Sequence, residues 1–248
     1  MKKEIRNITE DGKTLQVTIA DERWYLKTAE DGSITEYPSV TWIADHYPKG
    51  VEFYKWLAKH GWNEAESIKE TAGDKGHKVH QGISSLLLCN KLSMDDTLRN
   101  SDTGEPEAIK LQEYEAILSF ADWFKEAKPK TLENELVVFN EEHRYAGTAD
   151  YICEMDGERW LIDFKTSQSV WPSFEMQLSA YAHALAKELK PDKLGILQVG
   201  YRKNKRGFKL TEVEDQFDLF LAAKRIWQKE CQGVTMFKKD YPVSISLF

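Results

Sequence analysis

Cysteine is scarce in this chain, with 3 residues among 248. Cys89, Cys153 and Cys231 form no CxxC pair, so the sequence predicts free thiols in a reducing compartment and no disulfide framework. Long apolar runs are also lacking. No stretch approaches the roughly 18 apolar residues of a membrane span, and the first residues lack the apolar centre of a signal peptide. We therefore expect a cytoplasmic protein that contacts no membrane.

Positive charge is not in excess either, because 34 Lys and Arg stand against 41 Asp and Glu, a formal net charge of −7. This balance argues against tight, non-specific binding to duplex nucleic acid, which depends on cationic contacts to phosphates. The local exception is the stretch 201–209, with five positive charges and two aromatic residues around a predicted turn. Such a segment can contact phosphates and stack on a base, and a solvated basic turn explains it equally well. Its candidate nucleic-acid-binding residues are Tyr201, Arg202, Lys203, Lys205 and Arg206.

Asp156 and Gly157 form a strong two-residue turn signal between two strand-forming stretches. If the chain turns there, residues whose numbers add up to 313 pair with one another, and Asp150 lies directly opposite Asp163. Directly opposed Cβ atoms are about 4.5–5.5 Å apart. Lys165 projects from the same face, because side chains alternate along a strand. We expect the other face to point toward the core, since it carries Ala149, Tyr151, Cys153, Met155, Trp160, Ile162 and Phe164.

Two carboxylates held this close repel each other unless something compensates their charge. A divalent cation is the usual compensation, and Mg²⁺ or Mn²⁺ takes carboxylates, waters and phosphate oxygens as ligands. A lysine beside such an ion can orient an attacking water or offset charge that develops on a phosphate. The plainer alternative is an exposed edge hairpin with an ordinary Asp–Lys ion pair.

Three further elements carry candidate residues. The helix after the second strand places Gln177 and Tyr181 four residues apart, and therefore on one face. A long helix over 62–92 carries His80, and the strand before the hairpin carries Glu135. Three of these residues have a structural alternative: Tyr181 as a core aromatic, Gln177 as a surface residue and His80 as a structural residue of an amphipathic helix.

Taken in order, these motifs resemble the RecB-like branch of the PD-(D/E)xK nuclease superfamily. Within that branch the chain is most similar to the mitochondrial genome maintenance exonucleases and related phage and bacterial exonucleases. The resemblance covers about 37–201 and rests on short elements in the expected order. These are Tyr37 to Thr41, Gly76-x-x-x-His80, Glu135, Gly147-x-x-Asp150, Asp163-x-Lys165 and Gln177-x-x-x-Tyr181.

The resemblance implies a metal centre with one or two Mg²⁺ or Mn²⁺ ions. Its ligands would be Asp150, Asp163, the backbone carbonyl of Phe164 and His80. Some relatives hold an iron–sulfur cluster with four cysteines, and three scattered cysteines argue against such a cluster here. The likeness to phage and bacterial enzymes implies the cytoplasm of a bacterial or phage-infected cell.

The same resemblance gives roles to the remaining candidates. Lys165 would orient the attacking water or stabilise charge on the phosphate. Glu135 would bind the metal through water or orient a ligand. Gln177 and Tyr181 would position the lysine, the water or a phosphate of the cleaved strand.

We expect a single nuclease domain over 1–248, because no linker, repeat or low-complexity tract divides the chain. The predicted class is α/β, a restriction-endonuclease-like core with a mixed central sheet flanked by helices. A short N-terminal β-hairpin and a helical, arch-like insertion would be added to it. The expected parts are a β extension (1–37), a mostly helical part (38–130), the catalytic core (131–233) and a tail (234–248).

Several boundaries are predicted within these parts. Two short helices over 40–60 break near 48–50, and a helix covers 106–127. The polar stretch 93–105 is expected to be a flexible loop at the rim of the arch. The helix that carries Gln177 is expected to reach Leu189.

The expected function is metal-dependent exonucleolytic cleavage of DNA, with single strands favoured, in recombination, repair or replication. A structure- or sequence-specific endonuclease on the same scaffold is one alternative. A non-catalytic nucleic-acid-binding or assembly protein is another. The last five residues, Ser244 to Phe248, resemble peptides that dock on a replication sliding clamp but lack the leading Gln, and a packed terminal strand explains them as well.

Overall fold

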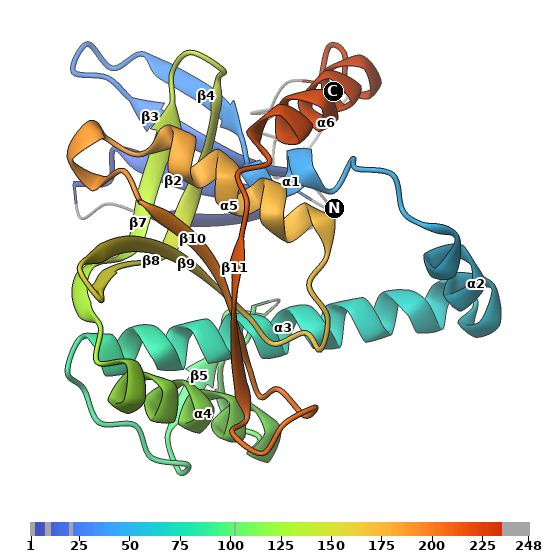
Figure 1. Ribbon diagram of the computed structural model, residues 1–248. Helices are drawn as coiled ribbons and strands as arrows, with labels where there is room; N and C mark the ends of the chain where they lie inside the picture. The colour runs from blue at the N-terminus through green and yellow to red at the C-terminus, as the bar shows by residue number, and fades with distance from the viewer. Residues whose placement is uncertain (1–2, 8–10, 20–21, 102, 235–248) are drawn as a thin grey trace, which may run out of the picture.

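Five strands form the central sheet of the computed structural model, which describes residues 3–7, 11–19, 22–101 and 103–234. Their order is β11-β10-β9-β8-β7 (Figure 1). The pair β9–β10 is parallel and the other neighbours are antiparallel, which gives the mixed sheet that was predicted. The strands are β7 (Lys130–Asn140), β8 (Tyr145–Met155), β9 (Glu158–Lys165), β10 (Lys193–Val199) and β11 (Phe208–Val213).

The turn between β8 and β9 lies at Asp156 and Gly157, whose φ angles are 53° and 81°. Two consecutive positive φ angles are what a type I′ hairpin turn requires. The pairing of Tyr151 with Ile162 confirms the predicted register. Both strands lie inside the sheet, so the alternative of an exposed edge hairpin is wrong.

One residue of the predicted core-facing set departs from strict alternation. Ala149 packs in the cluster with α5 (Pro172–Ala184), whereas Tyr151 packs in the cluster on the opposite side of the sheet. The change falls where β8 stops pairing with β9 and where Glu135, on the neighbouring strand, has a φ of 54°. The regular period of two is therefore interrupted next to Asp150.

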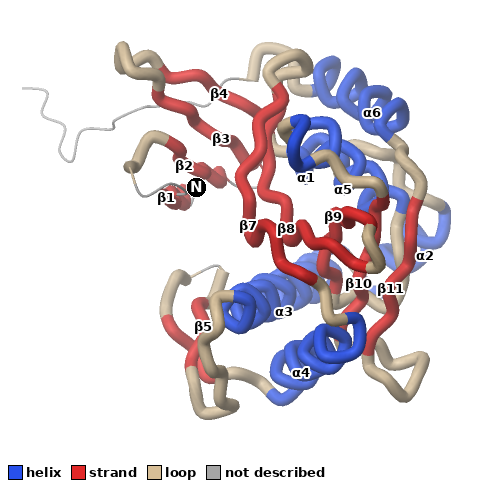
Figure 2. The backbone as a smooth tube through the Cα atoms, turned by 60° about the vertical axis from the view of Figure 1, so that its left-hand side comes forward, coloured by secondary structure: helices blue, strands red, loops and turns tan. Residues whose placement is uncertain are grey.

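Helices cover both faces of the sheet (Figures 1 and 2). On one face α1 (Val40–Ala44), α5 and α6 (Phe217–Glu230) share an apolar cluster with Ile152, Leu161 and Ile196. On the other face α3 (Trp62–Leu87) and α4 (Leu111–Ala127) pack against Ile162, Phe164 and neighbouring residues. Burial of these large apolar side chains contributes about 1.5–3 kcal/mol each, and it holds the middle strands between two layers of helices.

The N-terminal extension contains the predicted β-hairpin within a four-stranded antiparallel sheet. Its strands are β1 (Lys3–Asn7), β2 (Thr14–Ile19), β3 (Glu22–Thr28) and β4 (Ile34–Pro38). It meets the core through Tyr25, whose hydroxyl lies 3.0 Å from Thr148 Oγ1. Ser39 follows β4, bridges to Ala146 and accepts a hydrogen bond from the Trp42 N–H at the start of α1. The segment 37–41 thus joins this sheet to the core.

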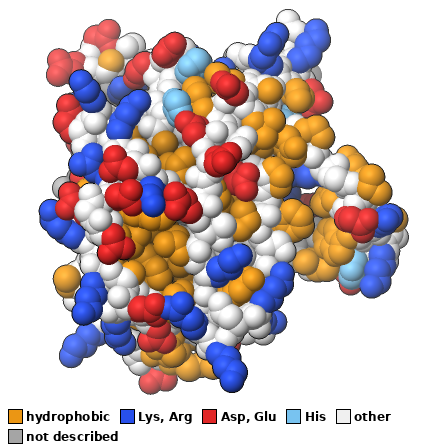
Figure 3. All heavy atoms as spheres, viewed as in Figure 1, with side chains coloured by type: hydrophobic (Ala, Val, Ile, Leu, Met, Phe, Trp, Pro, Cys, Tyr) orange, Lys and Arg blue, Asp and Glu red, His pale blue; other side chains and the backbone are white. Residues whose placement is uncertain are grey.

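Helix α2 (Val51–His60) stands away from the rest of the protein (Figures 1 and 3). None of its residues is buried. Phe53 is 40% exposed and Tyr54 is 58% exposed, on a helix that also carries Lys55 and Lys59. The predicted helical insertion is therefore present, and its projecting part is α2 with the N-terminal half of α3.

The polar stretch expected as a flexible rim loop contains a small hairpin, β5 (Thr97–Arg99) paired with β6 (Pro106–Ala108). Helix α4 accordingly begins at Leu111 instead of 106. Its start is fixed because Glu113 Oε2 accepts a hydrogen bond from the Lys110 N–H at 2.7 Å. Helix α5 ends at Ala184, and a separate 3₁₀ turn covers Lys187–Leu189.

No helix among the described residues is long and apolar enough to cross a membrane. The proposed clamp-binding peptide, Ser244 to Phe248, lies outside the described residues.

Candidate active site

The candidate site lies at the C-terminal end of β9, where its pairing with β8 ends. Tyr151 and Ile162 are the last paired residues. Beyond them the backbone N–H of Phe164 donates to Asp150 Oδ2 across 2.8 Å. A side-chain carboxylate thus replaces the strand-to-strand hydrogen bond, which anchors Asp150 beside Asp163 as the register predicts.

Asp163 is 1% exposed. Its Oδ2 lies 2.7 Å from the Lys165 ammonium, yet the contact lacks hydrogen-bond alignment, so this buried oxygen has an ion-pair partner but no aligned donor. Burial raises the pKa of Asp163 to about 6, against the attraction of Lys165 and with added repulsion from Asp150. An oxygen of this kind is available to a cation.

The pKa of Asp150 is shifted in the opposite direction. Burial acts to raise its pKa, but the charge and hydrogen bond of His80, with Lys165 and the Phe164 N–H, outweigh burial and lower the pKa. The two neighbouring carboxylates therefore differ in proton affinity. Asp150 faces the cations His80 and Lys165, whereas Asp163 is more deeply buried.

His80 reaches the site from α3. Its Nε2 lies 2.9 Å from the Phe164 carbonyl oxygen, and its Nδ1 lies 3.5 Å from Asp150 Oδ1. Both ring nitrogens thus face oxygens, which favours the doubly protonated ring. Burial opposes that charge, but Asp150 raises the pKa of His80 to about 9. The histidine named from sequence lies against two of the expected ligands.

Glu135 approaches from β7. The pairs on either side of it, Asn134 with Tyr151 and Leu136 with Ala149, leave it opposite Asp150. Its φ of 54° places a non-glycine residue in the left-handed region, which costs about 1–3 kcal/mol and is typical of functional sites. Sequence patterns gave no signal of this conformation.

Partial burial and the Asp150 charge raise the pKa of Glu135 to about 7. Because the side chain is also exposed to solvent on one side, water screens part of this effect. One ligand atom each from His80, Glu135 and Asp150 lie within 4.8 Å of one another. This is a spacing at which a single metal ion can be shared.

Helix α5 contributes the side chains that contact Asp163 and Lys165. Gln177 Nε2 lies 3.4 Å from Asp163 Oδ1 and 2.9 Å from the Tyr181 hydroxyl oxygen, and Gln177 Oε1 accepts from Lys165 at 3.4 Å. The Lys165 ammonium also lies 4.8 Å from the centre of the Phe174 ring. Phe174 was not identified from sequence. An aromatic residue at the start of a helix carries no signal until tertiary structure brings a cation to its face.

Gly147 is explained by packing. A Cβ at this position would lie 2.3 Å from Tyr181 Cε1, so only glycine lets the tyrosine lie against β8. Tyr181 in turn supports Gln177 through the hydrogen bond between them. Gly147 acts on the site through these two side chains.

The donor set suits a divalent cation. Carboxylates and a backbone carbonyl are ligands for Mg²⁺ and Mn²⁺, and an imidazole is compatible with Mn²⁺. Asp150, Glu135 and His80 form the core of this set, and Asp163 and the Phe164 carbonyl adjoin it through the contacts above. The residues fit the cation that the sequence implied.

The basic stretch forms the turn between β10 and β11 and contributes no residue to this cluster. Arg206 pairs with Glu126 and lies 4.6 Å from the centre of the Phe208 ring. Lys203 and Lys205 are exposed. Arg202 and Tyr201 instead line a pocket beside α3.

Comparison with known proteins adds one match. The model of the PD-(D/E)XK nuclease superfamily matches residues 53–243. No curated protein matches the chain. The matched region covers more than half of the sequence and contains all the side chains of the site described above. This chain belongs to the PD-(D/E)XK nuclease superfamily.

Proposed function

We propose that the protein is a Mg²⁺- or Mn²⁺-dependent exonuclease that hydrolyses phosphodiester bonds of DNA, with single strands preferred. Its cellular setting would be DNA recombination, repair or replication, and its place in the superfamily the RecB-like branch. The observation that carries the proposal is the His80–Glu135–Asp150 group beside the Asp163–Lys165 pair. Superfamily membership supports nuclease chemistry at this group.

The cation would be held by Asp150, Asp163, Glu135, His80 and the Phe164 carbonyl. When bound, it would supply a Lewis acid that lowers the pKa of water and offsets charge on the phosphate. Lys165 would donate a hydrogen bond to the attacking water or to a phosphate oxygen. Its ammonium is held by Asp163 and Gln177.

Gln177 and Tyr181 would act as positioning residues. Gln177 touches both Asp163 and Lys165, and Tyr181 fixes the Gln177 amide. Such a link between the two charged residues restrains the lysine rotamers, and a well-oriented group contributes more to catalysis than a mobile one.

The exonuclease assignment is supported by α2. This helix stands off on the side where the segment joining β9 to α5 runs (Figure 1), and it presents Phe53, Tyr54 and Lys55 to solvent. Aromatic and basic side chains together suit single-stranded nucleic acid, whose bases stack and whose phosphates attract cations. We propose that a free strand end passes beneath α2 to reach the site.

Cleavage assays test the nuclease assignment. End-labelled single-stranded, duplex and flap DNA, with RNA as comparison, are incubated in Mg²⁺ or Mn²⁺ with wild type, Asp163→Ala and Lys165→Ala. We expect cleavage by the wild type and none by either variant, and circular dichroism should show folded proteins. The exposed variant Asp122→Asn is the matched control. Full activity in excess chelator, or in either site variant, would overturn the proposal.

The requirement for an end is tested separately with one sequence in two forms. A linear single strand should be degraded, whereas the same strand closed into a circle should resist. Rapid cutting of the circle would show an endonuclease on the same scaffold. A protein that binds DNA but neither cleaves it nor takes up Mn²⁺ in calorimetry would be a binding module.

A further inference from the structure

A pocket of about 200 Å³ lies between α3, the N-terminal end of α4 and the turn that joins β10 to β11. Figure 1 shows this turn beside the end of α4, below α3. Lys75 of α3 and Arg202 of the turn both line the pocket, with Gln112 and Tyr201. None of the metal-site residues lines it, so it is a separate feature of the surface.

The two cations of the pocket are poorly compensated. Lys75 is partly buried, and both burial and the Arg202 charge lower its pKa. Among the described residues, no carboxylate lies within ion-pair distance of Lys75 or of the Arg202 guanidinium. Glu113 and Glu115 attract Lys75 only at longer range. Glu113 is engaged by Lys78, and Glu115, which lines the pocket, is exposed. Two neighbouring positive charges without a partner are unfavourable until an anion joins them.

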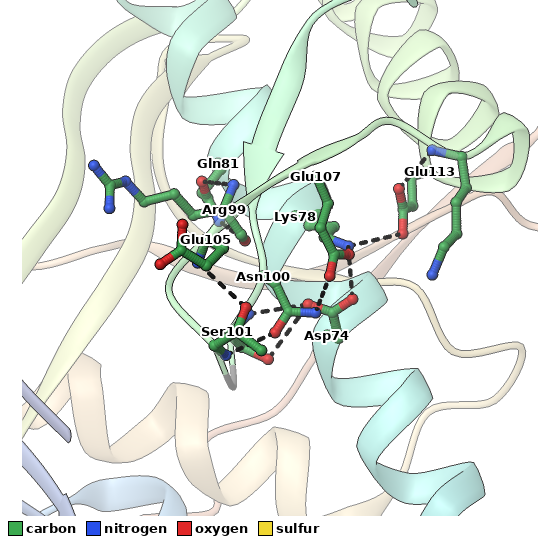
Figure 4. A network of polar contacts seen from close by, with 11 residues as sticks. Asp74, Lys78, Gln81, Arg99, Asn100, Ser101, Glu105, Glu107 and Glu113 are labelled. Atoms are coloured by element: carbon green, nitrogen blue, oxygen red, sulfur yellow. Dashed lines mark hydrogen bonds and ion pairs between the residues drawn. The ribbon is translucent and has the colours of Figure 1, made fainter. Parts of the chain in front are cut away.

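The neighbouring carboxylates are already engaged by a different lysine (Figure 4). Lys78, one turn further along α3, is fully buried and lies 2.8 Å from Asp74, 2.5 Å from Glu107 and 3.9 Å from Glu113. These three acids converge on Lys78 from α3, β6 and α4. The arrangement leaves Lys75, on the same helix, free to bind an anion.

The pocket wall formed by the turn is rigidly anchored. The Gly200 N–H donates to Ser119 Oγ at 2.9 Å, and the Tyr201 N–H donates to the Gly207 carbonyl at 2.7 Å. Gly200 has a φ of +63°, and a Cβ there would lie 3.1 Å from the Ala116 Cβ. Glycine therefore allows the turn to press against α4, which fixes the backbone next to Arg202.

The pocket is also tied to the catalytic strand. Gln168, three residues after Lys165, accepts from the Arg202 N–H at 2.8 Å and donates to the Gly200 carbonyl at 3.0 Å. Gly76, which follows Lys75 in α3, approaches the same segment. A Cβ on Gly76 would lie 3.8 Å from Thr166 Oγ1. Both cations thus border the segment that leaves the active site.

We propose that this pocket binds a backbone phosphate of the nucleic-acid substrate flanking the scissile one, with Lys75 and Arg202 as its cationic contacts. The inference rests on the proposed function and extends it, because the substrate must be a polynucleotide long enough to reach from the metal site to the pocket. Figure 3 shows further Lys and Arg side chains on this face of the protein. They would attract the strand toward the pocket.

The experiment measures binding of a labelled single-stranded oligonucleotide by fluorescence anisotropy, in chelator so that no cleavage occurs. Lys75→Gln and Arg202→Gln should each weaken binding about threefold to fivefold, and each should lower the slope of log K against log salt by about 0.7, the value for one lost phosphate contact on a single strand. Glu115→Gln should strengthen binding, because it removes a negative charge from the same pocket. Lys187→Gln, an exposed lysine beyond the end of α5, is the matched control.

Two further measurements separate binding from folding and from the metal site. The Tm of Lys75→Gln should equal or exceed that of the wild type, since it removes a partly buried charge that lies near Arg202. Mn²⁺ affinity measured by calorimetry should be unchanged in all four variants. Arg202 is exposed, so its variant reports on binding even if Lys75→Gln loses stability.

The outcomes distinguish the pocket from the proposed function. If wild type binds and cleaves DNA, and Lys75→Gln and Arg202→Gln bind like the control, the pocket inference fails and the nuclease proposal stands. If wild type neither binds nor cleaves any nucleic acid in Mn²⁺, both fail. If inorganic phosphate stabilises wild type but not Arg202→Gln, while oligonucleotide binding stays equal, the pocket takes free phosphate and the inference is overturned.

Discussion

The carboxylate of Asp150 takes the place of a strand partner for Phe164, because its Oδ2 accepts the Phe164 N–H at 2.8 Å. Phe164 is almost fully buried, so this N–H has no water to replace a lost acceptor. The same side chain that would bind a metal therefore also joins β8 to β9. Charge and hydrogen bonding at this residue can be separated by substitution.

Asp150→Asn keeps an acceptor oxygen for the Phe164 N–H and removes the negative charge. We expect a folded protein with no cleavage and much weaker Mn²⁺ binding, and with a lower Tm than the wild type because His80 and Lys165 lose the charge that they stabilise. Asp150→Ala leaves the N–H unpaired and should be less stable than Asp150→Asn by about 1–3 kcal/mol. Urea denaturation and calorimetry measure both effects. Equal stability of the two variants would show that the hydrogen bond contributes nothing.

Gly147→Ala should damage the site without touching a charged residue. The added Cβ would lie 2.3 Å from Tyr181 Cε1, so Tyr181 must move and Gln177 loses its support. We expect a loss of about 1–3 kcal/mol, typical of overpacking, together with a lower kcat. Gly73→Ala, where the Cβ meets nothing within 4 Å in α3, should instead stabilise by about 0.5–1 kcal/mol. Recovery of stability when Tyr181→Leu is combined with Gly147→Ala would identify the clash as the cause.

Metal binding should strengthen as pH rises. The folded protein raises the pKa of Asp163 to about 6, of Glu135 to about 7 and of His80 to about 9. Each folded pKa lies above its unfolded value, so the stability that these groups add is present at low pH and is lost as pH rises through about 6 to 9. A metal needs the deprotonated ligands and releases their protons.

The increase in Tm caused by Mn²⁺ should therefore grow between about pH 6 and pH 9, and metal affinity should rise up to about tenfold per pH unit for each proton released. Calorimetry in buffers of different ionisation enthalpy measures the protons released. His80→Gln should flatten the upper part of this profile, since His80 has the highest pKa of these three groups. A Tm increase that does not change with pH would contradict the role of these groups as ligands.

Removing Lys78 should be strongly destabilising. Its ammonium is the common partner of Asp74, Glu107 and Glu113, and both Lys78 and Glu113 are nearly inaccessible to water (Figure 4). Lys78→Met leaves these carboxylates without their cation, and loss of one partner of a buried ion pair costs about 3–5 kcal/mol. Chemical denaturation measures the cost.

The pH dependence of the stability difference between wild type and Lys78→Met shows whether charge or packing causes it. Burial acts to raise the pKa of Asp74, but the hydrogen bond from Lys78 and the Ser101 N–H lower it below its usual value. The stability it adds is therefore present above the unfolded pKa and is lost as pH falls. The difference between wild type and Lys78→Met should shrink in acid. A difference that is constant with pH would point to packing and not to charge.

The hairpin of the site was predictable because its determinants are local. Asp156 and Gly157 suit a turn with positive φ, and a fixed turn sets the register of every pair that follows it. The alternation of apolar residues located both strands, and the superfamily resemblance was confirmed. The RecB-like branch, the roles of the site residues and the clamp peptide stay predictions.

Other features depended on segments far apart in the sequence. Nothing near position 135 required a left-handed backbone, and no pattern placed Phe174 under the Lys165 ammonium. The stretch 93–105 was predicted to be a loop because its polar residues show no helical or strand periodicity. In the structure it is part of a hairpin that Asp74 and Lys78 of α3 hold in place. Local propensity is a weak guide where buried charge decides the conformation.

The sequence by itself determined the α/β class, the β8–β9 register and the identity of the charged residues on it. Only the tertiary structure decided how they meet. His80 contacts the Phe164 carbonyl 84 positions along the chain, and Arg202 faces Lys75 across a pocket that the β10–β11 turn completes. Turns and strand pairs follow from neighbouring residues, whereas pKa shifts and charge clusters depend on distances between distant segments, which packing alone sets.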